Sequence, residues 1–153
     1  MGYIDQNLLQ DERIVFRTKK HLIVFFFPVV WTLFSLYAYD YMHSNFILSK
    51  LDWLPFFVAL IFWSYVGLNY LTSDFAVTNK RVMMREGFFY RRANELRLTA
   101  ISQVNVDQSL LGQMLHYGTV SINAFGAYDT YTLIARPIPF QKAIQQKMDQ
   151  ANT

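Results

Sequence analysis

The chain contains no cysteine, and this absence excludes several kinds of chemistry. A disulfide framework, a thiolate zinc site and a cysteine nucleophile all require that residue. The three histidines, His21, His43 and His116, are widely spaced, whereas a metal site needs converging ligands. The six glycines form neither a dinucleotide-binding signature nor a P-loop. We therefore expect no metal site and no cofactor.

Catalytic constellations are also missing. Ser109, Glu95, Asp107 and His116 belong to residue types found in hydrolytic triads, but their spacing supports neither a triad nor a nucleophile elbow. Glu95 and Arg97 are better explained as surface residues that pair with neighbouring strands. We therefore expect a protein that is not an enzyme.

Charge is scarce and slightly basic. Charged residues make up 16% of the chain, the formal net charge is +3, and the isoelectric point is about 9.2. A balance of this size fits contact with an anionic membrane surface and is too weak to indicate nucleic acid. We expect membrane lipid as a partner and no nucleic-acid partner.

Charge is missing altogether from residues 22–39 and 53–73. As helices rising about 1.5 Å per residue, these stretches would reach roughly 27–32 Å, close to the ~30 Å hydrocarbon core of a bilayer. They predict a transmembrane hairpin. Pro28 is expected to kink the first helix or to need local repair of its hydrogen bonds. Because residues 1–21 are mixed in charge and no cleavage motif follows, we expect a retained anchor and not a signal peptide.

Lysine and arginine are distributed unevenly around the two stretches. Arg13, Arg17, Lys19 and Lys20 precede the first, the intervening loop has only Lys50, and many more follow the second. By the positive-inside rule both termini are cytoplasmic. Neither stretch has an aspartate, glutamate, lysine, arginine or histidine in its interior, which disfavours a transporter.

The rest of the chain has a β pattern. Residues 13–18 are β-branched and partly alternating, which predicts a strand that pairs with the C-terminal region, because a single strand is unstable alone. Residues 109–116 are expected to form a loop or a short helical turn. Alternation and turn residues predict further strands at residues 75–78, 81–85, 88–92, 94–98, 104–107, 119–123 and 130–135. A final amphipathic helix is predicted from the shared face of Phe140, Ala143, Ile144 and Met148.

A series of motifs resembles those of bacterial pleckstrin-homology-like membrane proteins, in the same order and over nearly the whole chain. They are F-A-V-T-N-K-R-V at residues 75–82, E-G-F at 86–88, E-L at 95–96 with Ile101, V-N-V-D-Q-S at 104–109, L-G at 111–112, Y-G-T-V at 117–120 and R-P at 136–137. Two residues depart from the pattern: Gln113 stands where arginine is common, and His116 where glycine is common. A role that this arginine has elsewhere does not transfer to this chain.

The resemblance implies an α+β membrane protein. Its transmembrane hairpin is joined to a pleckstrin-homology-like fold, a seven-stranded bent β-barrel or sandwich capped by a C-terminal helix. The hairpin is expected to make a multi-pass protein of the bacterial inner membrane, with residues 40–52 as a short periplasmic loop. Residues 74–153 form the cytoplasmic domain, and the strand in residues 1–21 is expected to pack on it.

Basic residues on the cytoplasmic side are the first candidate site. Lysine and arginine near an anionic leaflet each gain about 1 kcal/mol, so these residues could bind lipid headgroups or a partner. The simpler interpretation, which we favour, is that they set the topology and form a solvated surface. The set comprises Lys19, Lys20, Lys80, Arg81, Arg85, Arg91, Arg92 and Arg97.

Residues 109–117 are the second candidate site, because four large apolar side chains stand close together there: Leu110, Leu111, Met114 and Leu115. The segment could dock a partner or dip toward lipid. The alternative that we favour is a loop whose apolar residues plug one end of the barrel.

Two functions fit the sequence. The first is a non-enzymatic inner-membrane adaptor or scaffold, whose pleckstrin-homology-like domain binds a membrane-protein partner, another copy of the chain or anionic lipid headgroups. The second is an accessory subunit of a membrane enzyme or transport complex. The lack of catalytic residues and of ionisable residues in the hydrophobic stretches favours the first.

Overall fold

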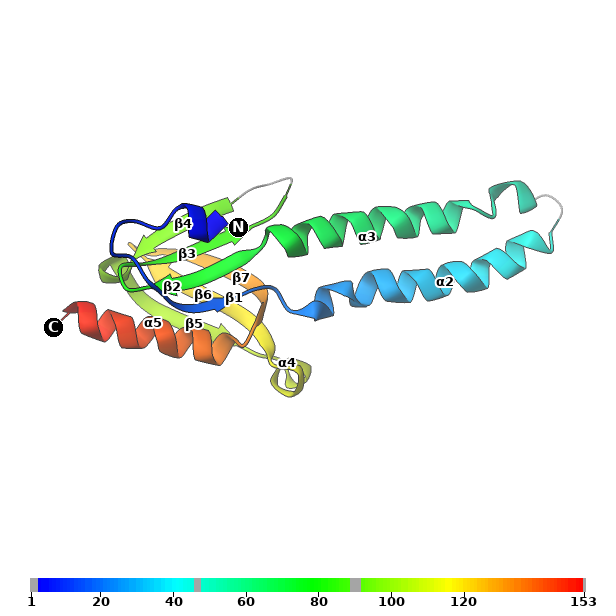
Figure 1. Cartoon of the computed structure of the whole chain (residues 1–153). Coiled ribbons are helices and arrows are strands. Elements are labelled where there is room, and N and C mark those ends of the chain that lie inside the picture. Colours follow the sequence, from blue (N-terminus) through cyan, green and yellow to red (C-terminus); the bar gives the residue numbers. More distant parts are fainter. Residues whose placement is uncertain (1–2, 46–47, 89–91, 153) are drawn as a thin grey trace. The chain divides into compact units, whose positions relative to one another are not determined.

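The computed structural model describes residues 3–45, 48–88 and 92–152. These divide into two compact units, one formed by Met1–His21 with Leu71–Thr153 and the other by Leu22–Tyr70. The helical unit is thus inserted in sequence between two parts of the β-rich unit (Figure 1).

The helical unit is an antiparallel pair. A 3₁₀ turn at Leu22–Phe25 (η1) leads into α2 (Phe26–His43), and a second turn at Ser49–Leu51 (η2) precedes α3 (Leu54–Thr72). Helical segments at Leu22–His43 and Ser49–Thr72 have mean hydropathies of 1.9 and 1.6, so both are long and apolar enough to cross a membrane by length and composition. Side-chain donors join the two helices, since Trp31 Nε1 and Ser35 Oγ both donate to the Pro55 carbonyl at 3.3 and 3.0 Å.

Pro28 lies just after a change of helix type, a local adjustment of the kind that the sequence offered as the alternative to a kink. The helix is preceded by η1 and begins at Phe26, which puts Pro28 in the first turn of α2.

Within the described residues, seven strands of the β unit form two antiparallel sheets. One sheet has the order β1-β2-β3-β4 and the other β5-β6-β7. The strands are β1 (Ile14–Thr18), β2 (Asp74–Thr78), β3 (Arg81–Glu86), β4 (Arg92–Arg97), β5 (Ile101–Asp107), β6 (Tyr117–Ala124) and β7 (Ala127–Ala135). The remaining elements are α1 (Tyr3–Gln6), η3 (Leu98–Ala100), α4 (Leu110–Leu115) and α5 (Pro137–Asn152). Most of the strand expected at 88–92 lies outside the described residues.

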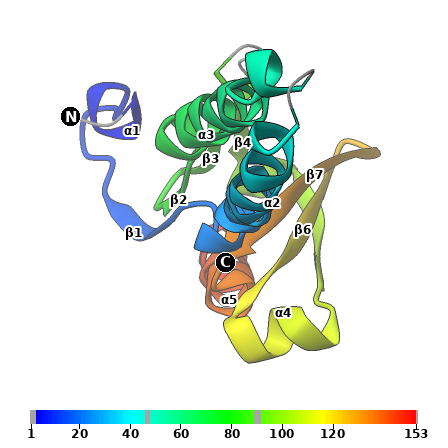
Figure 2. The same cartoon turned by 90° about the vertical axis from the view of Figure 1, so that its right-hand side faces the viewer.

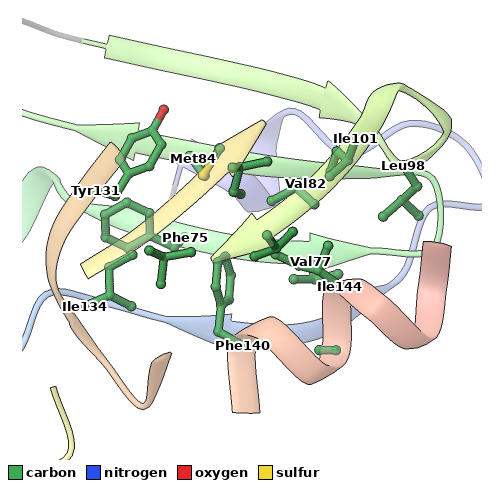
Figure 3. Packing of buried hydrophobic residues seen from close by; sticks show 14 residues of the cluster. Phe75, Val77, Val82, Met84, Leu98, Ile101, Tyr131, Ile134, Phe140 and Ile144 are labelled. Carbon is green, nitrogen blue, oxygen red and sulfur yellow. The ribbon is translucent and has the colours of Figure 1, made fainter. Parts of the chain in front are cut away.

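The main core lies between the two sheets and α5. Phe75 and Tyr131 meet edge to face with ring centroids 5.6 Å apart, and Phe140 and Ile144 reach them from α5 (Figure 3). Phe140, Ala143 and Ile144 are buried, as the predicted helical face requires. The sandwich closed by a helix thereby matches the expected architecture.

The N-terminal segment covers the other face of the first sheet. Ile4, Ala76 and Met83 are buried together, with Leu8 and Ile14 packed against them. This face would otherwise expose the apolar side chains that alternate with the core-facing ones along β2 and β3. The segment before the hairpin is therefore part of the β unit.

Strand β1 pairs with β2 although the whole hairpin lies between them in sequence. The register places Thr18 opposite Phe75 and Arg17 opposite Ala76. Because the strands are antiparallel, the C-terminal end of β1 and the N-terminal end of β2 lie at the same end of the pair. Both connections to the hairpin therefore leave the β unit from one place.

Candidate functional site

Arg81, one of the predicted basic site residues, lies at the centre of a buried network. Its guanidinium donates to the Glu12 carboxylate at 2.9 Å and to the Asn7 carbonyl at 2.7 Å, and it also pairs with Glu95. Thr78 Oγ1 and the Leu9 amide donate to the same Glu12 carboxylate at 2.7 and 2.8 Å. The Glu12 side chain is fully buried, and 15% of Arg81 is exposed. Arg81 thus joins the N-terminal segment to the β2–β3 hairpin.

The pKa of Glu12 reports this network. Burial raises the pKa of its carboxyl, but the hydrogen bonds from Arg81, the Leu9 amide and Thr78 and the charge of Arg81 act in the opposite direction, and together they lower it. Glu12 is therefore ionised in the folded protein at neutral pH. The negative charge compensates Arg81 inside the fold.

Lys20 and Lys80 also have partners within the chain. Lys20 Nζ pairs with Glu86 at 2.6 Å, and only 13% of its side chain is exposed. Lys80 Nζ donates to the Gln10 carbonyl at 3.0 Å. The structure therefore places Lys20 and Arg81 inside the fold, and we leave both out of a headgroup-binding surface.

The other basic residues do not share one face. Arg92 and Arg97 are exposed at the two ends of β4, and an odd separation along a strand directs side chains to opposite faces. Arg85 is half-buried on β3, opposite Asp74 and Ala93 in register. Arg91 lies outside the described residues. Among the predicted residues that the structure describes, Lys20 and Arg81 are paired within the fold and Arg92 faces away from Arg97, so these residues do not converge on a single basic site.

The predicted apolar segment forms a helix, α4, whose large side chains are exposed. The favoured interpretation, apolar residues that plug the end of the barrel, is therefore wrong. Gly112 is the buried residue of this helix. The exposed fractions are 81% for Leu110, 63% for Leu111, 76% for Met114 and 46% for Leu115.

Local interactions explain why α4 turns its apolar residues outward. Ser109 caps the helix by accepting a hydrogen bond from the Gly112 amide at 3.1 Å, and His116 ends it with a left-handed backbone at φ 60°. A Cβ on Gly112 would lie 2.6 Å from the carbonyl oxygen of Tyr117. Glycine therefore lets the helix pack closely on the chain below it through its small face.

Helix α4 leads into the start of β6 (Figure 2), and residues that the sequence analysis missed lie next to its C-terminal end. The Arg136 amide donates to the His116 carbonyl at 2.8 Å, and His116, Arg136 and Ile138 line a largely apolar hollow of about 370 Å³. Ile138 is itself 45% exposed. The signal in the sequence was the R-P pair at 136–137, but nothing in the pattern places it beside α4.

The end of β1 lies next to the same region. The rings of His21 and Tyr117 are 5.3 Å apart, and the His21 amide donates to the Leu133 carbonyl at 2.7 Å. The Ala135 amide donates to the Lys19 carbonyl at 3.0 Å. The point where the chain leaves the β unit for the hairpin therefore adjoins the C-terminal end of α4.

Polar side chains next to α4 hold the backbone in place. A cavity of about 380 Å³ next to the helix is lined by Asp107, Gln108, Ser109, Tyr117, Gly118, Thr119 and Leu133. Ser109 serves as the N-terminal cap of α4. Gln108 Nε2 donates to the Tyr117 carbonyl at 2.9 Å and so holds the chain that follows α4. Within residues 3–45, 48–88 and 92–152, no group of three or more histidine or carboxylate side chains could hold a metal ion.

Comparison with known proteins identifies the fold family. The family described as bacterial PH domain matches residues 22–152, a range that includes the helical unit as well as most of the β unit. A crystal structure of a DUF1696 family protein with a pleckstrin-homology domain from Shewanella loihica PV-4 is similar over 50% of this chain and 70% of that one, at 17% identity and a TM-score of 0.40. No curated protein matches the chain. Since the family match extends over most of the sequence, this chain belongs to the bacterial PH domain family.

Proposed function

We propose that the chain is a non-enzymatic adaptor or scaffold of the bacterial inner membrane. Its helical hairpin crosses the membrane twice, with both termini in the cytoplasm. Its PH-like unit binds a membrane-protein partner, another copy of the chain or anionic lipid headgroups. The observation that carries the proposal is the insertion of an apolar hairpin between two strands that pair with each other.

The strand pairing supports this topology. Both connections leave the β unit from one end of the β1–β2 pair, where Thr18 lies opposite Phe75. Two chain segments that leave together enter the same leaflet, which keeps the β unit on one side. The exposed Lys19 at this end agrees with the positive-inside rule.

The surface of the hairpin supports a lipid environment. Large apolar side chains are exposed along both helices, among them Phe27 at 71%, Leu33 at 62% and Leu60 at 62%. A soluble protein rarely exposes contiguous apolar surface of this extent, because water contact with it is unfavourable. Lipid tails remove that cost.

A binding role follows from what the β unit offers. It presents a rigid sandwich with an exposed apolar helix, and the polar side chains near that helix are engaged as caps and backbone ligands. Such a surface can bind lipid or another protein without any chemical step. An adaptor uses this kind of surface.

The topology can be tested with single cysteines, since the natural chain has none. Ser44→Cys lies at the end of α2 and Gln145→Cys lies on exposed α5. In intact bacterial cells that make the full chain, a membrane-impermeant maleimide should label position 44 and should label position 145 only after the membrane is broken. The cysteine-free parent is the control. Labelling of position 145 in intact cells would refute cytoplasmic termini.

The adaptor role can be tested on the particle that mild detergent extracts from native membranes. We expect a particle heavier than one 18.1 kDa chain with its detergent. The excess mass should be a protein partner in a fixed ratio to the chain, further copies of the chain, or tightly held anionic lipid. A bare monomer without lipid preference would contradict the proposal. Stoichiometric recovery with an enzyme or transporter would favour the accessory-subunit function instead.

A further inference from the structure

We propose that α4, together with Ile138, inserts its aliphatic side chains into the membrane interface beside the point where the chain enters the first span. This makes a third membrane contact of the β unit, in addition to its two covalent connections. The inference rests on the proposed membrane anchoring. The partner is the lipid surface of the cytoplasmic leaflet.

The first support is the composition of the surface. Leu110 and Met114 are four residues apart and therefore neighbours on one helix face, as are Leu111 and Leu115. All four are substantially exposed, and α4 carries no charged residue. An uncharged, aliphatic helix surface matches the boundary between headgroups and acyl chains, where apolar faces of interfacial helices reside.

The second support is the position of α4 within the β unit. The ring of Tyr117, two residues after the helix, lies 5.3 Å from the ring of His21. Leu22, the residue after His21, begins the hairpin. Six residues of helix are about 9 Å long, so the whole of α4 lies within roughly 20 Å of the chain's entry into the span. The chain's entry into the span is therefore within reach of α4, as the proposed contact requires.

The third support is charge. Lys19 and Arg136 are exposed next to the same place, and within the described residues neither makes an ion pair. The Lys19 carbonyl accepts a hydrogen bond from the Ala135 amide, and the Arg136 amide donates to the carbonyl of His116, the residue that ends α4. Basic side chains at this level attract an anionic leaflet. Asp107, at the end of β5, lines a cavity with Tyr117 and Leu133 and would act against these two charges.

A lipid surface fits these residues better than a protein partner does. Hot spots of protein interfaces are enriched in tryptophan, tyrosine and arginine, whereas leucine is under-represented. A stable protein interface also needs about 800 Å² on each partner, more than one short helix with Ile138 offers. Membrane insertion needs only a few large aliphatic side chains whose position is already fixed by the anchor.

The experiment places a fluorescent reporter at single cysteines in the full-length chain. Met114→Cys and Leu110→Cys report on α4, and Tyr128→Cys is the matched control, with a side chain that is 60% exposed near the far end of the β6–β7 hairpin. Tyr128 pairs with Asn123, about 20 Å along β6 from Tyr117. Leu36→Cys, near the middle of α2, reports on the anchor itself. Each variant carries an environment-sensitive label and is reconstituted into vesicles of phosphatidylethanolamine and phosphatidylglycerol with nitroxide-labelled lipids.

The expected result is quenching and a blue-shifted emission at positions 110 and 114, with a quenched fraction at least twice that at position 128. If position 36 is quenched and positions 110 and 114 resemble position 128, the α4 proposal fails while the anchor stands. If position 36 is not quenched, the anchor fails. Shielding of positions 110 and 114 in native membrane vesicles, but not in pure lipid, would assign α4 to a protein partner and would also overturn the lipid contact.

Discussion

The buried pair of Glu12 and Arg81 makes a quantitative prediction about stability. Replacing Glu12 with glutamine preserves the shape of the side chain but removes the charge, and turns an amide donor toward the guanidinium of Arg81. Breaking a buried ion pair by neutralising one partner costs 3–5 kcal/mol in typical cases. Arg81 keeps its contact with Glu95, so we expect Glu12→Gln to lower the free energy of unfolding of the β unit by about 3 kcal/mol, the lower end of that range.

The assay must report on the β unit alone. All three tryptophans, Trp31, Trp53 and Trp63, lie between residues 22 and 70, so intrinsic tryptophan fluorescence follows the hairpin. Hydrogen exchange of the β2 and β3 amides follows opening of the β unit. A loss of about 3 kcal/mol raises the population of the open form, and with it the exchange rate of these amides, roughly 100-fold.

Glu95→Gln is the matched control, because Glu95 pairs with the same guanidinium from a partly exposed position. Its side chain is 37% exposed, whereas that of Glu12 is fully buried. Partly exposed ion pairs contribute about 0–1 kcal/mol, so exchange should change less than about fivefold. Equal effects of Glu12→Gln and Glu95→Gln would refute the assignment of stability to the buried half of the network.

Three further predictions concern the pH dependence of the Glu12 network, the packing of α4 and the charges beside α4. The pKa of Glu12 is lowered from its ordinary value of 4.5, so the contribution of its charge to the free energy of unfolding is fully present above that pH and is lost as the pH falls through the folded-state pKa. In the exchange assay, the stability difference between the natural chain and Glu12→Gln should therefore be constant from pH 5 to 8 and shrink below about pH 4.5. Gly112→Ala puts a Cβ 2.6 Å from a backbone oxygen and should displace α4, at a cost of about 1–3 kcal/mol, with faster exchange of residues 109–117; Gly67→Ala, whose Cβ meets nothing within 4 Å, should leave that exchange unchanged. Lys19→Glu with Arg136→Glu should reduce quenching of a label on α4 in anionic vesicles and have a smaller effect in vesicles of neutral lipid.

The fold followed from local patterns because its elements depend on neighbouring residues. Alternation at residues 13–18 predicted a strand, and β1 occupies Ile14–Thr18. Gly87, directly after β3, and Gly126, directly before β7, have positive φ angles of 88° and 82°, which is the conformation that glycine allows at low cost. Periodicity and turn chemistry predicted a series of short strands followed by an amphipathic helix, and the resemblance of the motifs to a known family implied their PH-like arrangement.

The candidate site was predicted less well, because the sequence gives the sign of each charge but not its distance to others. Arg81 and Glu12 are 69 residues apart in sequence, and their pairing arises only when the N-terminal segment folds over the first sheet. The same limit applies to α4. A run of leucines is compatible with a buried plug or an exposed helix, and a close contact at Gly112 decides between them.

The inserted hairpin also affects how the β unit folds. Arg17 and Asp74 are joined by hydrogen bonds across the β1–β2 pair, although 57 residues separate them in sequence. Closing a flexible loop of that length costs about 3–4 kcal/mol of chain entropy. A helical hairpin that forms first brings its two ends together and removes much of this cost before the strands pair. If the hairpin is formed by insertion into a bilayer, the membrane then acts on the cytoplasmic unit as more than an anchor, since it favours the pairing of β1 with β2 on which the Glu12–Arg81 network depends.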